Sequence, residues 1–299
     1  MSDEEIAPRT LALDEAALRG WPLPQANGGD KEARGRVLIV AGSSEIPGAA
    51  VLAATAALRA GAGKVTIATP ASIARPLAFA VPEARVIALQ EKSPGVISEN
   101  AIAPLQDLAD KVAALLVGPG LSYDDCTPRL TLALIRMFER VGIVADAAAM
   151  DVAQKSRGLV SRFSKPILLT PHAGEMAKLT GLKKDAIVAD PEGTARTASK
   201  EWNAVVALKG AITYIAAPDA RVWRHQGGNS GLATSGSGDV LAGLIAGLIA
   251  RGATLEQAAA WGVALHARAG ERLAQRLGSL GYLARELPTE VPSIMGSLS

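Results

Sequence analysis

The sequence predicts an α/β fold: a mostly parallel sheet with helices on both faces and an antiparallel edge. Short apolar runs rich in β-branched residues alternate with helical segments, which is the pattern of a parallel sheet covered on both sides. Two late strand-like runs precede a Pro218-Asp219-Ala220 turn, which predicts a hairpin. With 299 residues, 49% of them hydrophobic, the chain can form one large domain.

The first 34 residues are expected to form a lead-in arm, and residues 35–299 a single domain. The arm contains several prolines and one short helical segment near residues 14–19. The expected strands cover residues 37–41, 65–69, 84–89, 113–117, 142–145, 166–170, 205–208, 213–216 and 222–223. The expected helices cover residues 49–60, 99–110, 127–140, a segment ending at 180, two segments within 185–202, 239–251 and 254–277. Thr254 and Gln257 have the spacing of a capping box for the last helix.

The stretch from Gly227 to Gly252 has two chemically different halves. Up to Gly238 it consists of small and hydroxyl-bearing residues, and from Asp239 onward it has the apolar spacing of a buried helix. A glycine-rich loop that runs into a helix leaves unpaired N–H groups at the positive end of the helix dipole, which suits a phosphate.

Asp239 lies at that helix end and has two interpretations. It could compensate the dipole and cap the helix, or it could act as a base beside a bound phosphate. The positive helix end is expected to keep its carboxylate ionised at pH 7. Further along the same helix, Gly243 and Gly247 predict the close approach of a neighbouring element.

The composition argues against several classes of function. The formal net charge of +2 gives no electrostatic case for nucleic acid or an anionic membrane surface as partner. Cys126 is the single cysteine and the three histidines lack metal-ligand spacing, so disulfides and a common zinc site are not expected. The N-terminus lacks the apolar run of a secretory signal, and the longest apolar run, 240–250, is shorter than the roughly 20 residues of a membrane span. We expect a cytoplasmic protein.

Five loops rich in small and polar residues occupy the kind of position that binds ligands. They cover residues 42–48, 118–120, 170–175, 209–213 and 229–239. Ligands of open α/β sheets bind beyond the carboxyl ends of the strands, where loops lead into helices. The sequence therefore predicts a long cleft along one edge of the sheet.

Taken together, these loops resemble the ADP-dependent (S)-NAD(P)H-hydrate dehydratase family of the ribokinase-like superfamily. The resemblance rests on Pro47-Gly48-Ala49, Gly118-Pro119-Gly120-Leu121, Thr170-Pro171-His172-Ala173-Gly174-Glu175, Lys209-Gly210-Ala211-Ile212-Thr213 and the run from Asn229 to Asp239, in the family's order over residues 36–285. It implies a stand-alone dehydratase that repairs hydrated NADH or NADPH, uses Mg²⁺ and ADP as co-substrate, and releases AMP and phosphate. Most bacterial members use ADP and eukaryotic members use ATP, and a homotetramer is implied.

The resemblance also assigns roles by position. The residues that would face the hydrated substrate are Ala49, Gly118, Gly120, His172 and Asp239. The residues that would hold the adenine nucleotide are Lys209, Gly210, Ala211, Ile212, Thr213 and Gly238. The N–H groups of Ser235, Gly236, Ser237 and Gly238 would form an anion hole. No metal ligand is assigned, and the preference for NADH or NADPH hydrate stays open.

The chain departs from the family pattern at three positions. Asp146-Ala147-Ala148-Ala149-Met150 stands where members usually read Asp-Ala-Asp-Ala-Leu, so Ala148 replaces a second acid. Ser235 replaces a usual glycine, and Ala173 a common proline. Many members also carry an N-terminal epimerase domain, whereas about 35 residues precede the first strand here. We therefore expect the epimerase to be a separate protein.

Several candidates also have a structural interpretation. His172, which follows a proline, could contact the substrate or cap the helix that begins there, and Glu175 is expected to complete that cap. Lys209 could hold a phosphate or be an ordinary surface lysine, and Asp146 could face a ligand or cap the next helix.

The expected mechanism places Asp239 as the base that takes the proton from the hydroxyl on the hydrated ring. That oxygen attacks the terminal phosphate of the nucleotide, and the ring nitrogen then expels phosphate. Two alternatives stay open: an ATP-dependent kinase of a sugar or vitamin alcohol, and a nucleotide-binding regulatory protein without turnover. His225 and His266 are expected to be structural or exposed.

Overall fold

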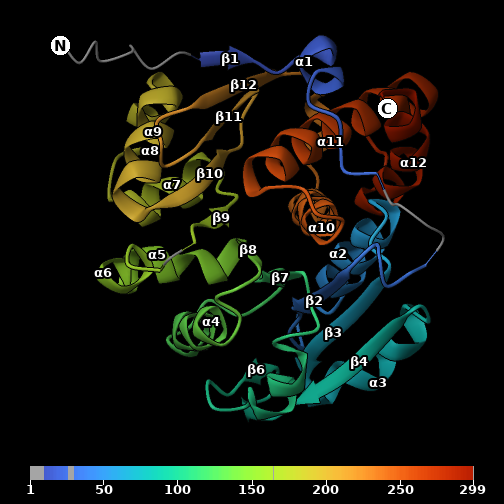
Figure 1. Ribbon diagram of the computed structural model, residues 1–299, viewed down its shortest axis with the longest axis vertical. Coiled ribbons are helices and arrows are strands. Elements are labelled where there is room, and N and C mark those ends of the chain that lie inside the picture. The colour runs from blue at the N-terminus through green and yellow to red at the C-terminus, as the bar shows by residue number, and fades with distance from the viewer. Residues whose placement is uncertain (1–9, 26–29, 164, 299) are drawn as a thin grey trace.

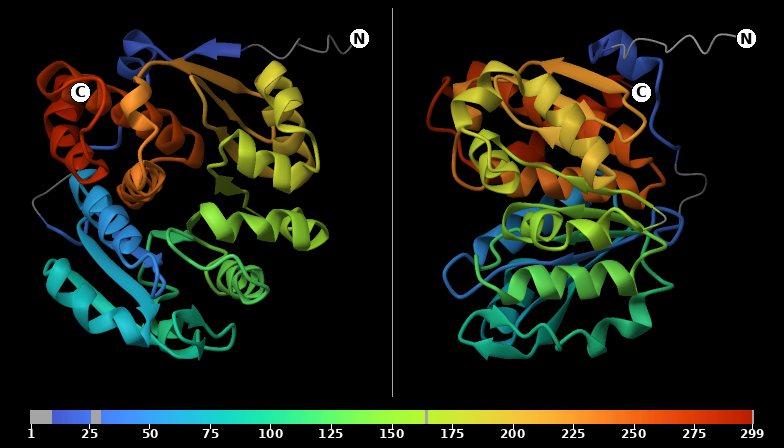
Figure 2. Two further views of the ribbon diagram at one scale, coloured as in Figure 1. Left: turned by 180° about the vertical axis from the view of Figure 1, so that it is seen from behind. Right: turned by 90° about the vertical axis from the view of Figure 1, so that its left-hand side faces the viewer.

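The computed structural model describes residues 10–25, 30–163 and 165–298, and it shows a large sheet between two layers of helices (Figures 1 and 2). The strands of the sheet run in the order β1-β12-β11-β10-β9-β8-β7-β2-β3-β4. Their bounds are β1 (Thr10–Ala12), β2 (Arg36–Val40), β3 (Lys64–Pro70), β4 (Ala84–Leu89), β7 (Ala114–Val117), β8 (Gly142–Ala145), β9 (Ile167–Leu169), β10 (Ala204–Leu208), β11 (Ile212–Ala216) and β12 (Val222–Gln226).

Neighbours pair in parallel from β10 through to β4, and β11 is antiparallel to both β10 and β12. This pairing confirms the predicted parallel sheet with an antiparallel edge. A separate small hairpin pairs β5 (Glu91–Ser93) with β6 (Val96–Ile97).

The two helical layers bury opposite faces of the sheet. In β2, Val37 and Ile39 belong to one core cluster while Leu38 and Val40 belong to the other, because successive side chains of a strand point to opposite faces. The first layer contains α2 (Gly48–Arg59), α3 (Ala71–Ala80), α10 (Ser237–Ala250), α11 (Leu255–Leu277) and α12 (Leu287–Leu298). The second contains η1 (Ala103–Leu108), α4 (Cys126–Met137), η2 (Ala147–Met150), α5 (Asp151–Lys155), α6 (Arg157–Val160), α7 (Ala173–Thr180), α8 (Lys184–Ala189) and α9 (Pro191–Trp202).

Helix α10 lies against α2 through Gly243 and Gly247, and the views in Figures 1 and 2 agree that the two helices are side by side. A Cβ atom at Gly243 would collide with the backbone of Ala53, and one at Gly247 with the backbone of Ala57. The predicted close approach at these glycines is therefore confirmed. It brings the two helices near enough for their backbones to touch, which fixes the position of the start of α10.

Part of the expected arm belongs to the sheet and its first helical layer. β1 pairs in parallel with β12 at the edge, and α1 (Glu15–Arg19) follows it, capped by Asp14. The amide of Gln257 donates to the carbonyl oxygens of Trp21 (3.2 Å) and Pro22 (2.8 Å). The predicted capping box at Thr254 is thus only half formed: Thr254 accepts from the Gln257 backbone, but the Gln257 side chain ties down the arm instead.

Other differences from the expected elements are local. The segment expected as a helix over 99–110 is a shorter 3₁₀ helix, η1, and helices α3, α5, α6 and α12 were not predicted. Pro76 inside α3 and Pro292 inside α12 mask the helical pattern there. Within the described ranges, no helix is both long and apolar enough to cross a membrane.

Candidate active site

A cleft of about 940 Å³ opens at the carboxyl ends of the parallel strands. Its lining comes from the loops after β8, β9 and β10, from the segment between β12 and α10, and from one side of α11. Predicted site residues that line it are His172, Lys209, Gly210, Ala211, Thr213, Ser235, Gly236, Ser237, Gly238 and Asp239. Most of the predicted site residues therefore lie on one continuous surface, although they come from segments far apart in the chain.

Ala49, Gly118, Gly120 and Ile212 are not among the residues that line this cleft. Ala49 is 2% exposed, and a Cβ atom at Gly120 would lie 2.7 Å from its methyl group. Gly118 has φ +129°, and a Cβ atom there would collide with the carbonyl oxygen of Asp146. In this conformation these loops pack behind the Asp146 side of the cleft, and their contact with substrate remains a prediction.

Asp239 lies in the first turn of α10, one turn after the left-handed Gly236 (φ 87°) at the N-cap. Burial raises the pKa of Asp239 to about 7, the negative charge of Asp146 adds to the rise, and Lys209 opposes it. The expectation that the helix end keeps this carboxyl fully ionised at pH 7 is therefore wrong, because desolvation outweighs the dipole. A carboxyl that titrates near neutrality is well matched to a general base at physiological pH.

Lys209 is the positive group among the acids of the cleft. Its Nζ lies 3.6 Å from Asp146 Oδ1 and 3.9 Å from Glu175 Oε2, and it borders Gly238 in the first turn of α10. Its backbone is fixed by a 2.8 Å bond from its N–H to the carbonyl of Pro171. Lys209 is thus a partly buried ion-pair partner rather than an ordinary surface lysine.

Asp146 is 3% exposed and does not cap the helix that follows it. Its Oδ1 accepts a 2.6 Å hydrogen bond from the hydroxyl of Thr170, whose role the sequence did not reveal. Ala147, next to it, has φ 48°, an uncommon conformation for a residue with a side chain. The cap interpretation is wrong, and Asp146 is held toward the cleft by the neighbouring strand end.

His172 caps α7 and also lies at the cleft. Its Nδ1 accepts from the N–H groups of Gly174 (2.9 Å) and Glu175 (3.2 Å), and Glu175 accepts from the His172 N–H at 2.8 Å. The capping interpretation of His172, and the prediction that Glu175 completes the cap, are confirmed. The ring is still largely exposed at the rim, so a substrate contact remains open to it.

The turn before α10 offers fewer N–H groups to an anion than expected. The N–H of Ser237 already donates to the carbonyl of Thr234 at 3.2 Å. Among the described residues, no hydrogen bond uses the N–H of Gly238 or Asp239. The Ser237 N–H is therefore engaged within the turn, whereas the N–H groups of Gly238 and Asp239 are not. An anion hole at this turn remains a prediction.

Two histidines that were expected to be structural or exposed also line the cleft. His225 faces Thr213 across the β11–β12 pair, and its Nδ1 bonds the carbonyl of Leu13 at 3.0 Å. His266, on α11, bonds Ser237. Neither could be found from the sequence, since His266 is 29 residues from its partner and carries no local motif.

The acids of the cleft do not form a cage for magnesium. In the part of the chain that is described, no three His, Cys, Asp or Glu side chains come together as a metal site. Lys209 occupies the space between Asp146 and Glu175, and Ala148 is 1% exposed in the core. A protein-held Mg²⁺ does not fit these residues.

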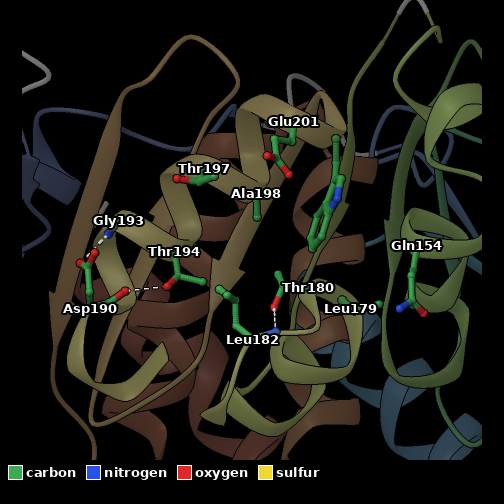
Figure 3. A pocket seen from close by; sticks show the side chains of 11 residues that line it. Gln154, Leu179, Thr180, Leu182, Asp190, Gly193, Thr194, Thr197, Ala198 and Glu201 are labelled. Carbon is green, nitrogen blue, oxygen red and sulfur yellow. Dashed lines mark hydrogen bonds between the residues drawn. The ribbon is translucent and has the colours of Figure 1, made fainter. Parts of the chain in front are cut away.

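A second cavity, of about 560 Å³, lies between α7, α9 and Gln154 (Figure 3). Several of its polar groups are already engaged: Asp190 accepts from Gly193, Thr194 donates to the Asp190 carbonyl, and Thr180 accepts from Leu182 (Figure 3). No predicted site residue lines it. The chemistry is therefore concentrated in the larger cleft.

Comparison with known proteins gives consistent matches. The family model described as NAD(P)H-hydrate dehydratase matches residues 37–293. The ADP-dependent (S)-NAD(P)H-hydrate dehydratase of Xanthomonas campestris pv. campestris is 48% identical over 291 residues, which are 97% of this chain and 98% of that protein. The bifunctional NAD(P)H-hydrate repair enzyme of Moorella thermoacetica is 41% identical over 270 residues, which are 90% of this chain and 51% of that enzyme.

Among solved structures, the ADP/ATP-dependent NAD(P)H-hydrate dehydratase from Bacillus subtilis, co-crystallized with ATP and Mg²⁺, is similar over nearly the whole chain. The TM-score is 0.82 at 27% sequence identity, with 98% of this chain and 100% of that chain covered.

Proposed function

The chain belongs to the NAD(P)H-hydrate dehydratase family, and we propose that it dehydrates the S form of hydrated NADH and NADPH at the expense of ADP. The products are NADH or NADPH, AMP and phosphate. Among the structural features, the one that carries the proposal is Asp239: a carboxyl with a pKa of about 7, facing the cleft from the first turn of α10.

Asp239 in its ionised form takes the proton from the ring hydroxyl of the hydrate. The freed oxygen attacks the terminal phosphorus of ADP, whose bond to the bridging oxygen breaks to release AMP. The N–H groups of Gly238 and Asp239 and the charge of Lys209 stabilise the phosphoryl oxygens. The ring nitrogen then expels phosphate, and loss of a proton from the neighbouring ring carbon restores the reduced nicotinamide.

A kinase on the same fold would stop at the phosphate ester, and a regulatory protein would not turn over. Family membership favours the dehydratase over both. The distinguishing experiment incubates the purified protein with hydrated NADH and ADP or ATP, and follows the absorbance of the reduced ring together with AMP and phosphate. Stable phosphorylated substrate without reduced NADH would contradict the proposal.

Replacing Asp239 with asparagine tests the assigned base. The variant should fold and bind ADP, because asparagine keeps the shape and can still accept hydrogen bonds, while kcat at pH 8 should fall by about 10² to 10⁴-fold. Calorimetric titration with ADP serves as the control for an intact site. Turnover within a few-fold of the parent would make Asp239 a structural residue.

The proposal also covers the metal ion, the supply of the substrate, the oligomeric state and the location of the protein. Mg²⁺ is proposed to arrive on the phosphates of ADP, completed by water, with no protein ligand assigned. An epimerase activity is proposed to supply the S form, since a relative of this chain is named as a bifunctional NAD(P)H-hydrate repair enzyme. We also propose that the protein is a homotetramer in the cytoplasm, where NADH and NADPH are used.

A further inference from the structure

His266 contacts the phosphate-binding turn from outside it. It lies on α11, and its Nε2 is 2.9 Å from Ser237 Oγ and 3.1 Å from the carbonyl oxygen of Ser237. Ser237 is the first residue of α10, two positions before Asp239, and both Ser237 and His266 line the cleft. The mechanism derived above gives neither side chain a role.

The two distances decide which atom carries the hydrogen. A carbonyl oxygen can only accept, so the contact at 3.1 Å requires a proton on Nε2 of His266. The same N–H then points at Ser237 Oγ, which must act as the acceptor in that contact. Burial lowers the pKa of His266 to about 4, so the ring stays neutral at physiological pH and Nδ1 keeps the lone pair.

The hydroxyl hydrogen of Ser237 is consequently directed elsewhere. It cannot point at Nε2, which already carries a hydrogen, and the hydrogen bonds of the described residues include no acceptor for it. The Ser237 N–H is also in use, donated to Thr234. The group that Ser237 can offer to a ligand in the cleft is therefore its hydroxyl, as a donor.

We propose that His266 is a positioning residue that fixes the Ser237 hydroxyl as a hydrogen-bond donor to a phosphate oxygen of the nucleotide. The inference rests on the proposed function, which places ADP in this cleft. A hydroxyl whose lone pair is occupied by an N–H matches a ligand that has only acceptors, and the oxygens of a phosphate are such a ligand. Ser237 thus joins the anion site through its side chain.

A double-mutant cycle tests this assignment. Ser237→Ala should lower kcat/KM for ADP by about tenfold or more, the scale of one hydrogen bond to a charged group. His266→Phe, which keeps a ring but has no N–H, should lower it several-fold in the parent and have little further effect in the Ser237→Ala background. His266→Gln, which restores an N–H donor, should recover part of the loss.

A purely structural role for His266 predicts a different pattern. The two fold-reductions in kcat/KM would then multiply in the double variant, and the loss of kcat/KM would follow the loss of stability. Leu265→Val, at the buried neighbour of His266 on α11, is the matched control: it should lower the melting temperature and leave kcat/KM unchanged. Multiplying losses, or equal kinetic damage in the control, would overturn the proposal.

The tautomer can be measured without any turnover. The chain has three histidines, so a ¹⁵N spectrum of histidine-labelled protein can be assigned with the His266→Gln variant. At pH 7 the Nε2 of His266 should have the shift of a protonated ring nitrogen and Nδ1 that of a bare one. The reverse would overturn the proposal. Absence of turnover by the parent enzyme would refute the proposed function alone, because the spectrum and calorimetric ADP affinity of Ser237→Ala still test Ser237.

Discussion

Replacing Asp146 with asparagine should move the pH dependence of catalysis to lower pH. Burial is the largest cause of the raised pKa of Asp239, and the negative charge of Asp146 is the next. The substitution removes that charge. It also frees Lys209, whose Nζ lies 3.6 Å from Asp146 Oδ1, to interact with Asp239 instead. Both changes stabilise the ionised form of Asp239, so both lower its pKa.

The size of the effect follows from the titration of one group. With a pKa of about 7 in the parent, roughly one-tenth of Asp239 is ionised at pH 6 and about nine-tenths at pH 8. If loss of the like charge lowers the midpoint by about one pH unit, about half of Asp239 is ionised at pH 6. Relative to its own plateau, the variant should then be about five-fold more active at pH 6 than the parent.

The assay is kcat/KM for hydrated NADH between pH 5 and pH 9 at saturating ADP, since this parameter reports groups of the enzyme before the hydrate binds. Asparagine at position 146 also weakens the hydrogen bond from Thr170, so the maximal kcat/KM of the variant can fall. The pH midpoint of the profile does not depend on that maximal value. Asp110→Asn, a charge change at an exposed site, is the control and should leave the midpoint at about 7. An unchanged or raised midpoint in Asp146→Asn would refute the electrostatic account of Asp239.

Three further substitutions test other parts of the site and fold. Lys209→Ala should weaken ADP binding by about 1.5 to 3 kcal/mol in calorimetry and shift the pH midpoint upward, since Lys209 lowers the pKa of Asp239. His172→Ala should lose the α7 cap, about 1 kcal/mol or about 2 to 4 °C in melting temperature, and raise KM for the hydrate; His172→Asn should keep the cap and still raise KM. Gly243→Ala should destabilise by about 1 to 3 kcal/mol against Ala53, whereas Gly296→Ala, with open space around it, should not.

The sheet could be predicted because its signal is local. Buried parallel strands are continuous apolar runs, and the helices between them show their own period, so both can be recognised one segment at a time. β1 could not be recognised in this way. It is three residues long, two of its three residues are exposed, and it forms because β12 offers it an edge with which to pair. The prediction that the Gln257 side chain caps its own helix was wrong for a related reason. Its amide bonds to distant carbonyl groups in the arm instead of to the local backbone.

The residues of the site could be predicted better than their protonation states. Loops after parallel strands converge on one edge, so the fold class itself places Asp146, His172, Lys209 and Asp239 together. The pKa of Asp239 depends on how deeply its carboxyl is buried and on how near Asp146 comes to it. The sequence alone shows that Asp239 lies at a helix end, but it gives neither of these quantities. The helix end by itself predicts a lowered pKa for Asp239, whereas the structure gives a raised one.

The family's glycine turn at Gly118 can be connected to the same electrostatics. Any side chain there would collide with the carbonyl oxygen of Asp146, and the positive φ of Gly118 would be strained in a residue other than glycine. A substitution would therefore push the Asp146 loop, whose next residue, Ala147, already has an uncommon backbone conformation. Movement of Asp146 away from Asp239 would lower the pKa of Asp239, as is expected for Asp146→Asn. Gly118 can thus influence the reaction through the position of a charge, whether or not it touches the substrate.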